Sequence, residues 1–149
     1  MADALYTAQA HVTGGRAEGH GETSDGMLDV ELRTPVEMGG PGGGTNPEEL
    51  FAVGYAGCFE SALGAIARRR RMDAGDVAID SRVSLLPTAD RAFKLAVALA
   101  VSLPSVPDPD TAAELVRAAH QVCPYSNATR GNIDIALSVN GRAVDPTAA

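Results

Sequence analysis

The longest run of apolar and small residues in the chain predicts a helix that is buried on nearly every side. The run extends from Leu50 through Ile66 inside the stretch Thr45–Arg71, and Glu60 is its only charge. A helix without a polar face packs inside a core and not on a surface. Four arginines, Arg68–Arg71, follow the run and complement the negative end of the helix dipole. We therefore expect the rest of the chain to be organised around this helix.

Helix-start signals stand just before the apolar run. Asn46 can cap the helix, Pro47 suits the first helical position, and Glu49 can complete a capping box. Glu48 adds negative charge to the first turn, where the helix dipole favours it. These residues predict that the core helix begins next to Asn46.

Alternating apolar and polar positions predict five strands, and a polar stretch, residues 19–24, can form a sixth. The clearest alternation lies in residues 93–103, where Phe, Leu or Val occupies every second position. Asp25-Gly26 is a hairpin signal between two of the other strands. The predicted strands are residues 5–12, 19–24, 28–32, 77–86, 93–103 and 133–139.

A second, amphipathic helix is predicted over Thr111–Val122. A Thr-x-x-Glu capping box opens it, and apolar residues follow at helical spacing. Cys123 stands at its end, because Pro124 limits continuation of the helix. Residues 125–130 can add one further turn, which Gly131 stops.

The remaining segments are predicted to be loops, and they fix the order of the elements. Residues 39–44 (GGPGGG) form a flexible loop, residues 104–109 form a proline-rich break, and Asn140-Gly141 ends the last strand before a frayed tail. The resulting order is β-β-β-α-β-β-α-β. Runs of strands separated by single helices are typical of an α+β fold. A chain of 149 residues suits a single domain, residues 1–149.

Composition narrows the class of protein. The apolar fraction is 45%, but the chain has only three Phe and no Trp, so its core would gain from burial against a second subunit. A net charge of −7 argues against a nucleic-acid partner, which needs a basic face. We find neither a long enough apolar stretch for a membrane span nor a signal-peptide layout, so we expect a soluble, cytoplasmic protein.

Cys58 and Cys123 are the candidates for chemistry. They are 65 positions apart, so they form neither a CxxC motif nor a zinc ribbon, and the cytoplasm keeps such thiols reduced. Gly54 and Gly57 lie within a turn of Cys58 and predict the close approach of another group. The three histidines show no ligand spacing with the cysteines, so no metal is expected. From the residues alone, an inert buried thiol remains the alternative to a reactive one.

Three segments of the sequence resemble the signatures of the organic hydroperoxide resistance family, a branch of the OsmC-like peroxidases. The order of elements derived above agrees with that resemblance, which covers nearly the whole chain. Gly57 stands where alanine is expected and Glu49 where glutamine is usual, and neither change removes a reactive group. The segments are SDGMLDVEL (residues 24–32), PGGGTNPEELFAVGYAGCF (residues 41–59) and CPYSNATRGNI (residues 123–133).

The resemblance implies an OsmC-like fold with antiparallel sheets around the core helix, in an intertwined homodimer with two active sites at the subunit interface. In this family the position of Cys58 carries the peroxidatic cysteine, and that of Cys123 the resolving cysteine. Arg16 matches the active-site arginine, and Glu48 matches the glutamate that pairs with it.

The implied activity is the reduction of organic hydroperoxides, alkyl or fatty-acid, to alcohols, with a role in organic peroxide detoxification. The reaction needs no metal or other cofactor. It passes through a Cys58 sulfenic acid and a Cys58–Cys123 disulfide, which a dithiol reduces, such as dihydrolipoamide or a lipoylated protein. We expect Phe51, Phe59 and Tyr125 to supply apolar walls for the substrate.

Two questions stay open in the sequence. Ten residues of continuous helix would separate Glu48 from Cys58 by about 15 Å. Either the helix breaks near its glycines, or the Arg16–Glu48 pair works from another direction, or the partner subunit contributes it. The alternative function is a non-catalytic protein that binds an apolar ligand in the same dimer pocket, with inert cysteines.

Overall fold

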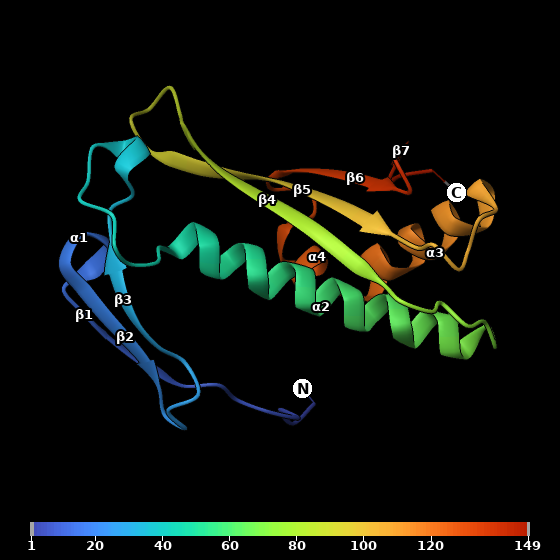
Figure 1. Ribbon diagram of the computed structural model, residues 1–149, viewed down its shortest axis with the longest axis horizontal. Helices are drawn as coiled ribbons and strands as arrows, with labels where there is room; N and C mark the ends of the chain where they lie inside the picture. The colour runs from blue at the N-terminus through green and yellow to red at the C-terminus, as the bar shows by residue number, and fades with distance from the viewer. Residues whose placement is uncertain (1, 149) are drawn as a thin grey trace. The chain divides into compact units, whose positions relative to one another are not determined.

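Helix α2 (Pro47–Arg69) has 23 residues and connects the two parts of the structure, a computed structural model that describes residues 2–148. One compact unit ends at Leu50, in the first turn of α2, and the second begins at Phe51 (Figure 1). The α+β class and the order of elements predicted from the sequence are confirmed. One domain over residues 1–149 stays a prediction.

The first unit contains an antiparallel three-stranded sheet in the order β1-β2-β3. Its first strand is shorter than predicted, because Leu5 and Tyr6 lie exposed outside the sheet. Two short elements that carry no sequence pattern were missed, α1 and a 3₁₀ helix, η1. The elements are β1 (Ala10–Thr13), α1 (Gly15–Glu18), β2 (Gly19–Thr23), β3 (Asp29–Arg33) and η1 (Val36–Met38).

The glycine-rich loop before α2 is tied to the first sheet. The backbone N–H of Thr45 donates to the carbonyl of Glu31 at 2.8 Å, and that of Arg33 donates to the carbonyl of Thr45 at 3.0 Å. A Cβ on Gly44 would lie 2.6 Å from the Glu31 carbonyl oxygen, so only glycine fits there. The loop predicted from the sequence is confirmed. It is not free, however, because these hydrogen bonds hold its end against the sheet.

The predicted helix start is confirmed in its main feature. Asn46 Oδ1 accepts a hydrogen bond from the Glu49 backbone N–H at 2.8 Å, as an N-cap does, and Pro47 is the first helical residue. The capping box differs from the prediction, because the Glu49 carboxylate accepts a bond from the Thr45 hydroxyl at 2.9 Å. The helix ends at Arg69.

By length and composition alone, α2 could cross a membrane, which we did not expect from the sequence. Core helices of soluble proteins pass the same test. Six α2 side chains are buried in the core of the second unit: Tyr55, Phe59, Ala62, Leu63, Ile66 and Ala67.

The second unit contains a four-stranded sheet in the order β4-β5-β6-β7. The pairing of β5 with β6 is parallel, so this sheet is mixed and not antiparallel throughout. A parallel pair needs a crossover connection, and α3 and α4 supply it. The strands are β4 (Ala78–Pro87), β5 (Phe93–Ser102), β6 (Asp134–Val139) and β7 (Arg142–Val144).

The predicted strand end at Asn140-Gly141 is confirmed, because β6 ends at Val139, but this strand is not the last one: Asn140 and Gly141 form the turn from β6 into β7. Asn140 has a φ of 49°, a conformation that asparagine tolerates better than most residues. Its Oδ1 also accepts a hydrogen bond from the Leu103 backbone N–H at 2.7 Å. The turn therefore continues the sheet where we expected a frayed tail.

Helices α3 (Pro109–Val122) and α4 (Pro124–Thr129) meet at Cys123. The start of α3 was predicted two residues late. Asp108 is the N-cap, and its carboxylate accepts a hydrogen bond from the Thr111 backbone N–H at 2.9 Å. Pro109, assigned from the sequence to the break, is the first helical residue, a position where proline is favoured.

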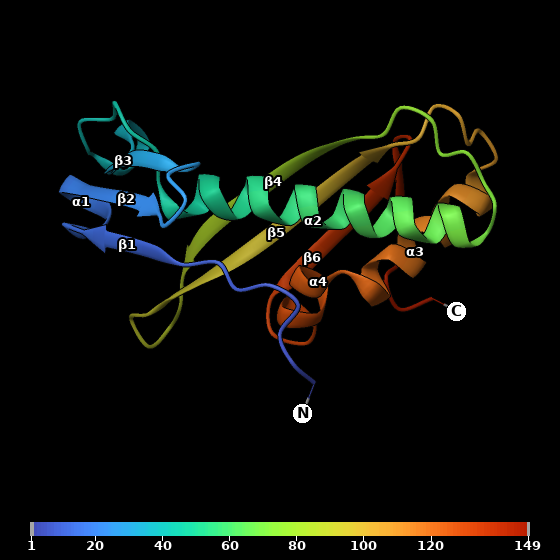
Figure 2. The same cartoon turned by 90° about the horizontal axis from the view of Figure 1, so that it is seen from below.

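The core of the second unit lies between one face of its sheet and these helices (Figures 1 and 2). Alternate residues of β5, among them Val97, Leu99 and Val101, are buried in the same apolar cluster as Leu63 of α2. The same cluster includes the buried face of α3 and Cys123. The sheet thus forms the common support on which the helices that carry the two cysteines are packed.

Candidate active site

The two cysteines lie together in the second unit, although 65 residues separate them in the sequence. Both are free thiols: Cys123 is fully buried and Cys58 is half-buried. Their side chains are within hydrogen-bonding reach of each other. Cys58 comes from the middle of α2 and Cys123 from the junction of α3 and α4.

Proline creates the junction that presents Cys123. The backbone of Cys123 is extended, with φ −65° and ψ 123°. Cys123 is both the C-cap of α3 and the N-cap of α4. Pro124 lacks an N–H and favours an extended residue before it, so one continuous helix cannot form. The break leaves the Tyr125 backbone N–H free to donate to the Cys58 sulfur.

The surroundings of Cys58 act on its pKa in both directions. Burial raises the pKa of the Cys58 thiol, and the hydrogen bond and charge of Cys123 raise it further. The backbone N–H of Tyr125 lowers that pKa, because it donates to the thiolate. Peroxide chemistry needs the thiolate, so a site of this kind gains from a nearby cation.

Arg16 and Glu48 form a bidentate ion pair in the first unit. Arg16 Nη1 and Nη2 donate to the two Glu48 carboxylate oxygens at 2.9 and 2.8 Å. Their hydrogen bond raises the pKa of the Arg16 guanidinium and holds the pKa of the Glu48 carboxyl below its usual value. The sequence resemblance named both residues, and the paired planar groups fix the direction of the guanidinium.

Two glycines place Arg16 for this pair. Gly14 and Gly15 have φ values of 72° and 62°, a left-handed conformation that side chains disfavour. A Cβ on Gly14 would also lie 2.4 Å from the Glu18 carbonyl oxygen. The Thr13-Gly14-Gly15 turn predicted from the sequence therefore leads into α1, and α1 carries Arg16.

Helix α2 is continuous from Pro47 to Arg69. The helix break that we considered between Glu48 and Cys58 is therefore absent, and about 15 Å of helix rise separates these two residues. Of the explanations left open by the sequence, another direction of approach and a partner subunit remain.

Three aromatic side chains pack together near the cysteines in the sequence of the second unit. Tyr125 packs on Phe51 and Tyr55, with ring centroids 5.7 and 5.6 Å away. A Cβ on Gly54 would lie 2.6 Å from the Tyr125 hydroxyl oxygen, so the close approach predicted at this glycine is confirmed. At Gly57 no atom of residues 2–148 lies within 4 Å of such a Cβ.

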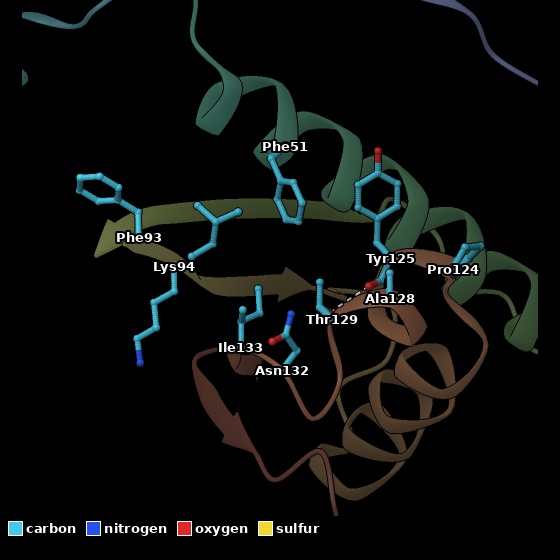
Figure 3. Close-up of a pocket in the computed structure, with 10 residues that line it drawn as sticks. Phe51, Phe93, Lys94, Pro124, Tyr125, Ala128, Thr129, Asn132 and Ile133 are labelled. Carbon is cyan, nitrogen blue, oxygen red and sulfur yellow. Dashed lines mark hydrogen bonds between the residues drawn. The ribbon is translucent and has the colours of Figure 1, made fainter. Parts of the chain in front are cut away.

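A cavity of about 760 Å³ lies next to two of these aromatic residues (Figure 3). Phe51 and Tyr125 line it, but Phe59 is fully buried in the core and is not among its lining residues within the described chain. The lining is mostly apolar. The other lining residues were not anticipated from the sequence: Phe93, Lys94, Leu95, Pro124, Ala128, Thr129, Asn132 and Ile133.

A buried polar cluster behind the cysteines was also missed. His120 Nδ1 and the Tyr55 hydroxyl both form hydrogen bonds with Ser126 Oγ, at 2.9 and 2.8 Å. The CPYSNATRG segment contains Ser126 and could have directed attention to it. His120 was considered only as a metal ligand.

One group of side chains in the first unit could hold a metal ion. Ligand atoms of His20, Glu22 and Asp29 lie within 4.8 Å of one another on partly or fully exposed side chains. His20 Nε2 lies 2.6 Å from Asp29 Oδ1, and this pair raises the pKa of His20. An ion pair on a sheet surface accounts for the group, and neither cysteine belongs to it.

The chain is similar to known proteins over most of its length. The sequence profile of the OsmC-like protein family matches residues 40–138. An organic hydroperoxide resistance protein of Xanthomonas axonopodis pv. citri (strain 306) is 50% identical over 139 residues, covering 91% of this chain and 94% of the relative.

Solved structures show the same fold. A crystal structure of an organic hydroperoxide resistance protein from Legionella pneumophila is 51% identical, with a TM-score of 0.88 over 92% of this chain and 98% of that one. A Vibrio cholerae relative, with captopril bound in one of its active sites, is 43% identical, with a TM-score of 0.90 over 95% and 96% of the two chains.

The chain therefore belongs to the OsmC-like family. Within that family it belongs to the organic hydroperoxide resistance proteins, which it resembles over more than nine tenths of its length.

Removing the Arg16 guanidinium should raise the pKa of Glu48, because the ion pair is the main cause of its low value. The folded pKa lies below the unfolded one, so the pair stabilises the fold above about pH 4.3 and loses this effect as the pH falls through the folded value. NMR titration of the Glu48 side-chain carbon in wild type and Arg16→Ala measures the shift. Arg33→Ala is the control, since that guanidinium pairs with Glu31. An unchanged Glu48 titration in Arg16→Ala would contradict the ion pair.

Proposed function

We propose that this chain is a two-cysteine thiol peroxidase that reduces organic hydroperoxides to alcohols. The observation that carries the proposal is the proximity of two free thiols, Cys58 and Cys123, with Pro124 and Tyr125, which follow Cys123 in the chain, lining an apolar cavity. Tyr125 joins these features, because its backbone N–H donates to Cys58 and its side chain lines the cavity.

The reaction takes two steps at these sulfurs. The Cys58 thiolate attacks the distal oxygen of the hydroperoxide, the O–O bond breaks, and the alkoxide leaves as an alcohol after it gains a proton. Cys58 is then a sulfenic acid. The Cys123 thiolate attacks its sulfur, the S–O bond breaks, and hydroxide leaves as water, which gives the disulfide. A dithiol, such as a lipoyl group, reduces that disulfide and is itself oxidised.

Burial opposes the first step, and two groups are proposed to offset it. The Tyr125 backbone N–H already donates to the Cys58 sulfur. Arg16 supplies a permanent positive charge to the thiolate in the assembled homodimer and donates to the peroxide oxygens, while Glu48 keeps the guanidinium aimed.

A homodimer is part of the proposal, and the first unit supports it. Large apolar side chains are exposed along this unit, and Leu32 is its one buried large apolar residue among those described. A small sheet with so little core needs another surface to cover it. The exposed residues are Leu5, Tyr6, Val12, Met27, Leu28, Val36 and Met38.

The cavity is proposed to hold the organic part of the substrate. Its volume of about 760 Å³ and apolar lining suit a bulky organic group. Phe51 and Tyr125 form its walls, and we leave Phe59 out because it is enclosed in the core. The proposal needs no cofactor, and a soluble, cytoplasmic protein is the setting that keeps both thiols reduced between turnovers.

Replacing the nucleophile tests the assignment. Cys58→Ser should lower peroxidase turnover with cumene hydroperoxide to below a few per cent of wild type, because the hydroxyl stays protonated and is a much weaker nucleophile. Glu60→Gln, on the exposed side of the same helix, is the control. One equivalent of the hydroperoxide should also consume both thiols of the wild type. A full thiol count after that treatment would favour a binding protein with inert cysteines.

Organic hydroperoxides should react much better than hydrogen peroxide. Burial of an organic group contributes about 0.8 kcal/mol per CH₂, so three or four buried groups give a preference of roughly 100-fold in kcat/KM. Steady-state kinetics with cumene hydroperoxide and hydrogen peroxide measure it. Phe51→Ala should lower the cumene hydroperoxide value and spare the hydrogen peroxide value. Equal values for both peroxides in the wild type would argue against an apolar substrate site.

A further inference from the structure

Four buried polar side chains form a connected group in the apolar core of the second unit. Ser126 Oγ lies 2.9 Å from His120 Nδ1 and 2.8 Å from the Tyr55 hydroxyl oxygen. The Tyr55 hydroxyl also lies 3.3 Å from Thr129 Oγ1. Each residue is at least nine tenths buried, with exposures of 0% for Tyr55 and Ser126, 2% for His120 and 7% for Thr129. We call the chain of Tyr55, Ser126 and His120 the polar clasp.

The clasp connects the helices that carry the two cysteines. Tyr55 stands three residues before Cys58 on α2. His120 stands three residues before Cys123, on α3, and Ser126 three residues after it, on α4. Tyr55 shares a face of α2 with Cys58, because residues three apart on a helix lie on the same side. His120 and Ser126 belong to the helices that adjoin Cys123 on either side. The clasp therefore joins α2 to both sides of the junction that presents Cys123.

Apolar side chains of similar shape could fill this part of the core equally well. A buried hydrogen-bonded group contributes little net stability over an apolar one of the same shape, yet it fixes direction and distance. Burial and the charge of Arg130 lower the pKa of His120, which favours the neutral imidazole. Arg130 also donates a hydrogen bond to the His120 carbonyl, so the end of α3 is held from a second side.

We propose that the polar clasp positions Cys123 against Cys58 for the disulfide step. This inference rests on the proposed peroxidase cycle and adds positioning residues to it. A disulfide forms only when the Cβ atoms lie about 3.5–4.5 Å apart and the sulfurs meet at a narrow range of torsion angles. The Cys123 backbone is bonded to the ends of both helices, because its N–H donates to the Ala119 carbonyl at 2.9 Å and its carbonyl accepts from the Asn127 N–H at 2.9 Å. The chain is not one continuous helix there, and the clasp fixes these two helix ends against α2.

The clasp acts on the second step more than on the first. Attack on the peroxide uses Cys58, which sits in the middle of the continuous helix α2. Attack on the sulfenic acid needs Cys123 at the right distance, and loss of orientation lowers the effective concentration of such a neighbouring group steeply. Weakening the clasp should therefore prolong the life of the Cys58 sulfenic acid.

Rapid-quench kinetics with cumene hydroperoxide separate the two steps. Tyr55→Phe removes one hydroxyl and keeps the aromatic ring, and His120→Leu removes the other end of the clasp. In both variants we expect the disulfide step to slow by about tenfold or more, and the first step by less than about threefold. His120→Asn, whose amide can still bond Ser126, should recover much of the rate of the disulfide step.

Val116→Ala is the matched control, because it opens the buried face of α3 one turn before His120 without touching the clasp. If it slows the disulfide step as much as Tyr55→Phe at an equal drop in Tm, the clasp has only a general structural role and the inference fails. The inference also fails if both steps slow together, or if neither slows. A wild type that forms no sulfenic acid would instead overturn the proposed peroxidase function.

Discussion

The approach of a buried thiol, Cys123, to a half-buried one, Cys58, is the contact on which the proposed chemistry depends. That contact joins an unbroken helix to a broken one. Helix α2 buries one face in the core of the second unit and holds Cys58, half-buried, against that core. The break at Pro124 turns Cys123 toward it, and the mixed sheet supports both helices. If α3 continued past Cys123, the Tyr125 N–H would form a hydrogen bond inside that helix. It would then not be free to donate to the Cys58 sulfur.

Burial of Cys58 has two opposing effects on the proposed reaction. The apolar surroundings that suit an organic substrate raise the pKa of Cys58, whereas the proposed reaction needs its thiolate. The Tyr125 backbone N–H lowers the pKa of Cys58 locally. We propose that the Arg16–Glu48 pair stabilises the thiolate more strongly, since a guanidinium remains charged at any physiological pH. The exposed apolar side chains of the first unit give a physical reason for a homodimer in which that pair can act.

The sequence predicted the features that local chemistry specifies. The apolar run, the Asn46 cap and the alternation along β5 each determine their element without help from distant residues. The short elements α1 and β7 were missed because three or four residues carry too little pattern. The parallel pairing of β5 with β6 was missed because strand pairing depends on long-range contacts.

The candidate site was predicted unevenly, for a related reason. The resemblance named both cysteines and the Arg16–Glu48 pair, and the structure shows the geometry of each pair. Because α2 is apolar on nearly every side, its sequence does not tell which phenylalanine faces the cavity, and Phe59 was misplaced for that reason. Polar residues are usually exposed, so nothing in the sequence marked His120 as buried.

Intact-mass spectrometry of wild type and Cys123→Ser after excess cumene hydroperoxide tests whether Cys58 and Cys123 form the proposed disulfide. The account predicts that the wild type loses about 2 Da as the intramolecular disulfide forms and then resists further oxidation. Cys123→Ser should gain about 32 or 48 Da, as Cys58 passes to sulfinic or sulfonic acid. A wild type that gains oxygen while Cys123 stays free would contradict the account, because Cys123 would then be only a packing residue.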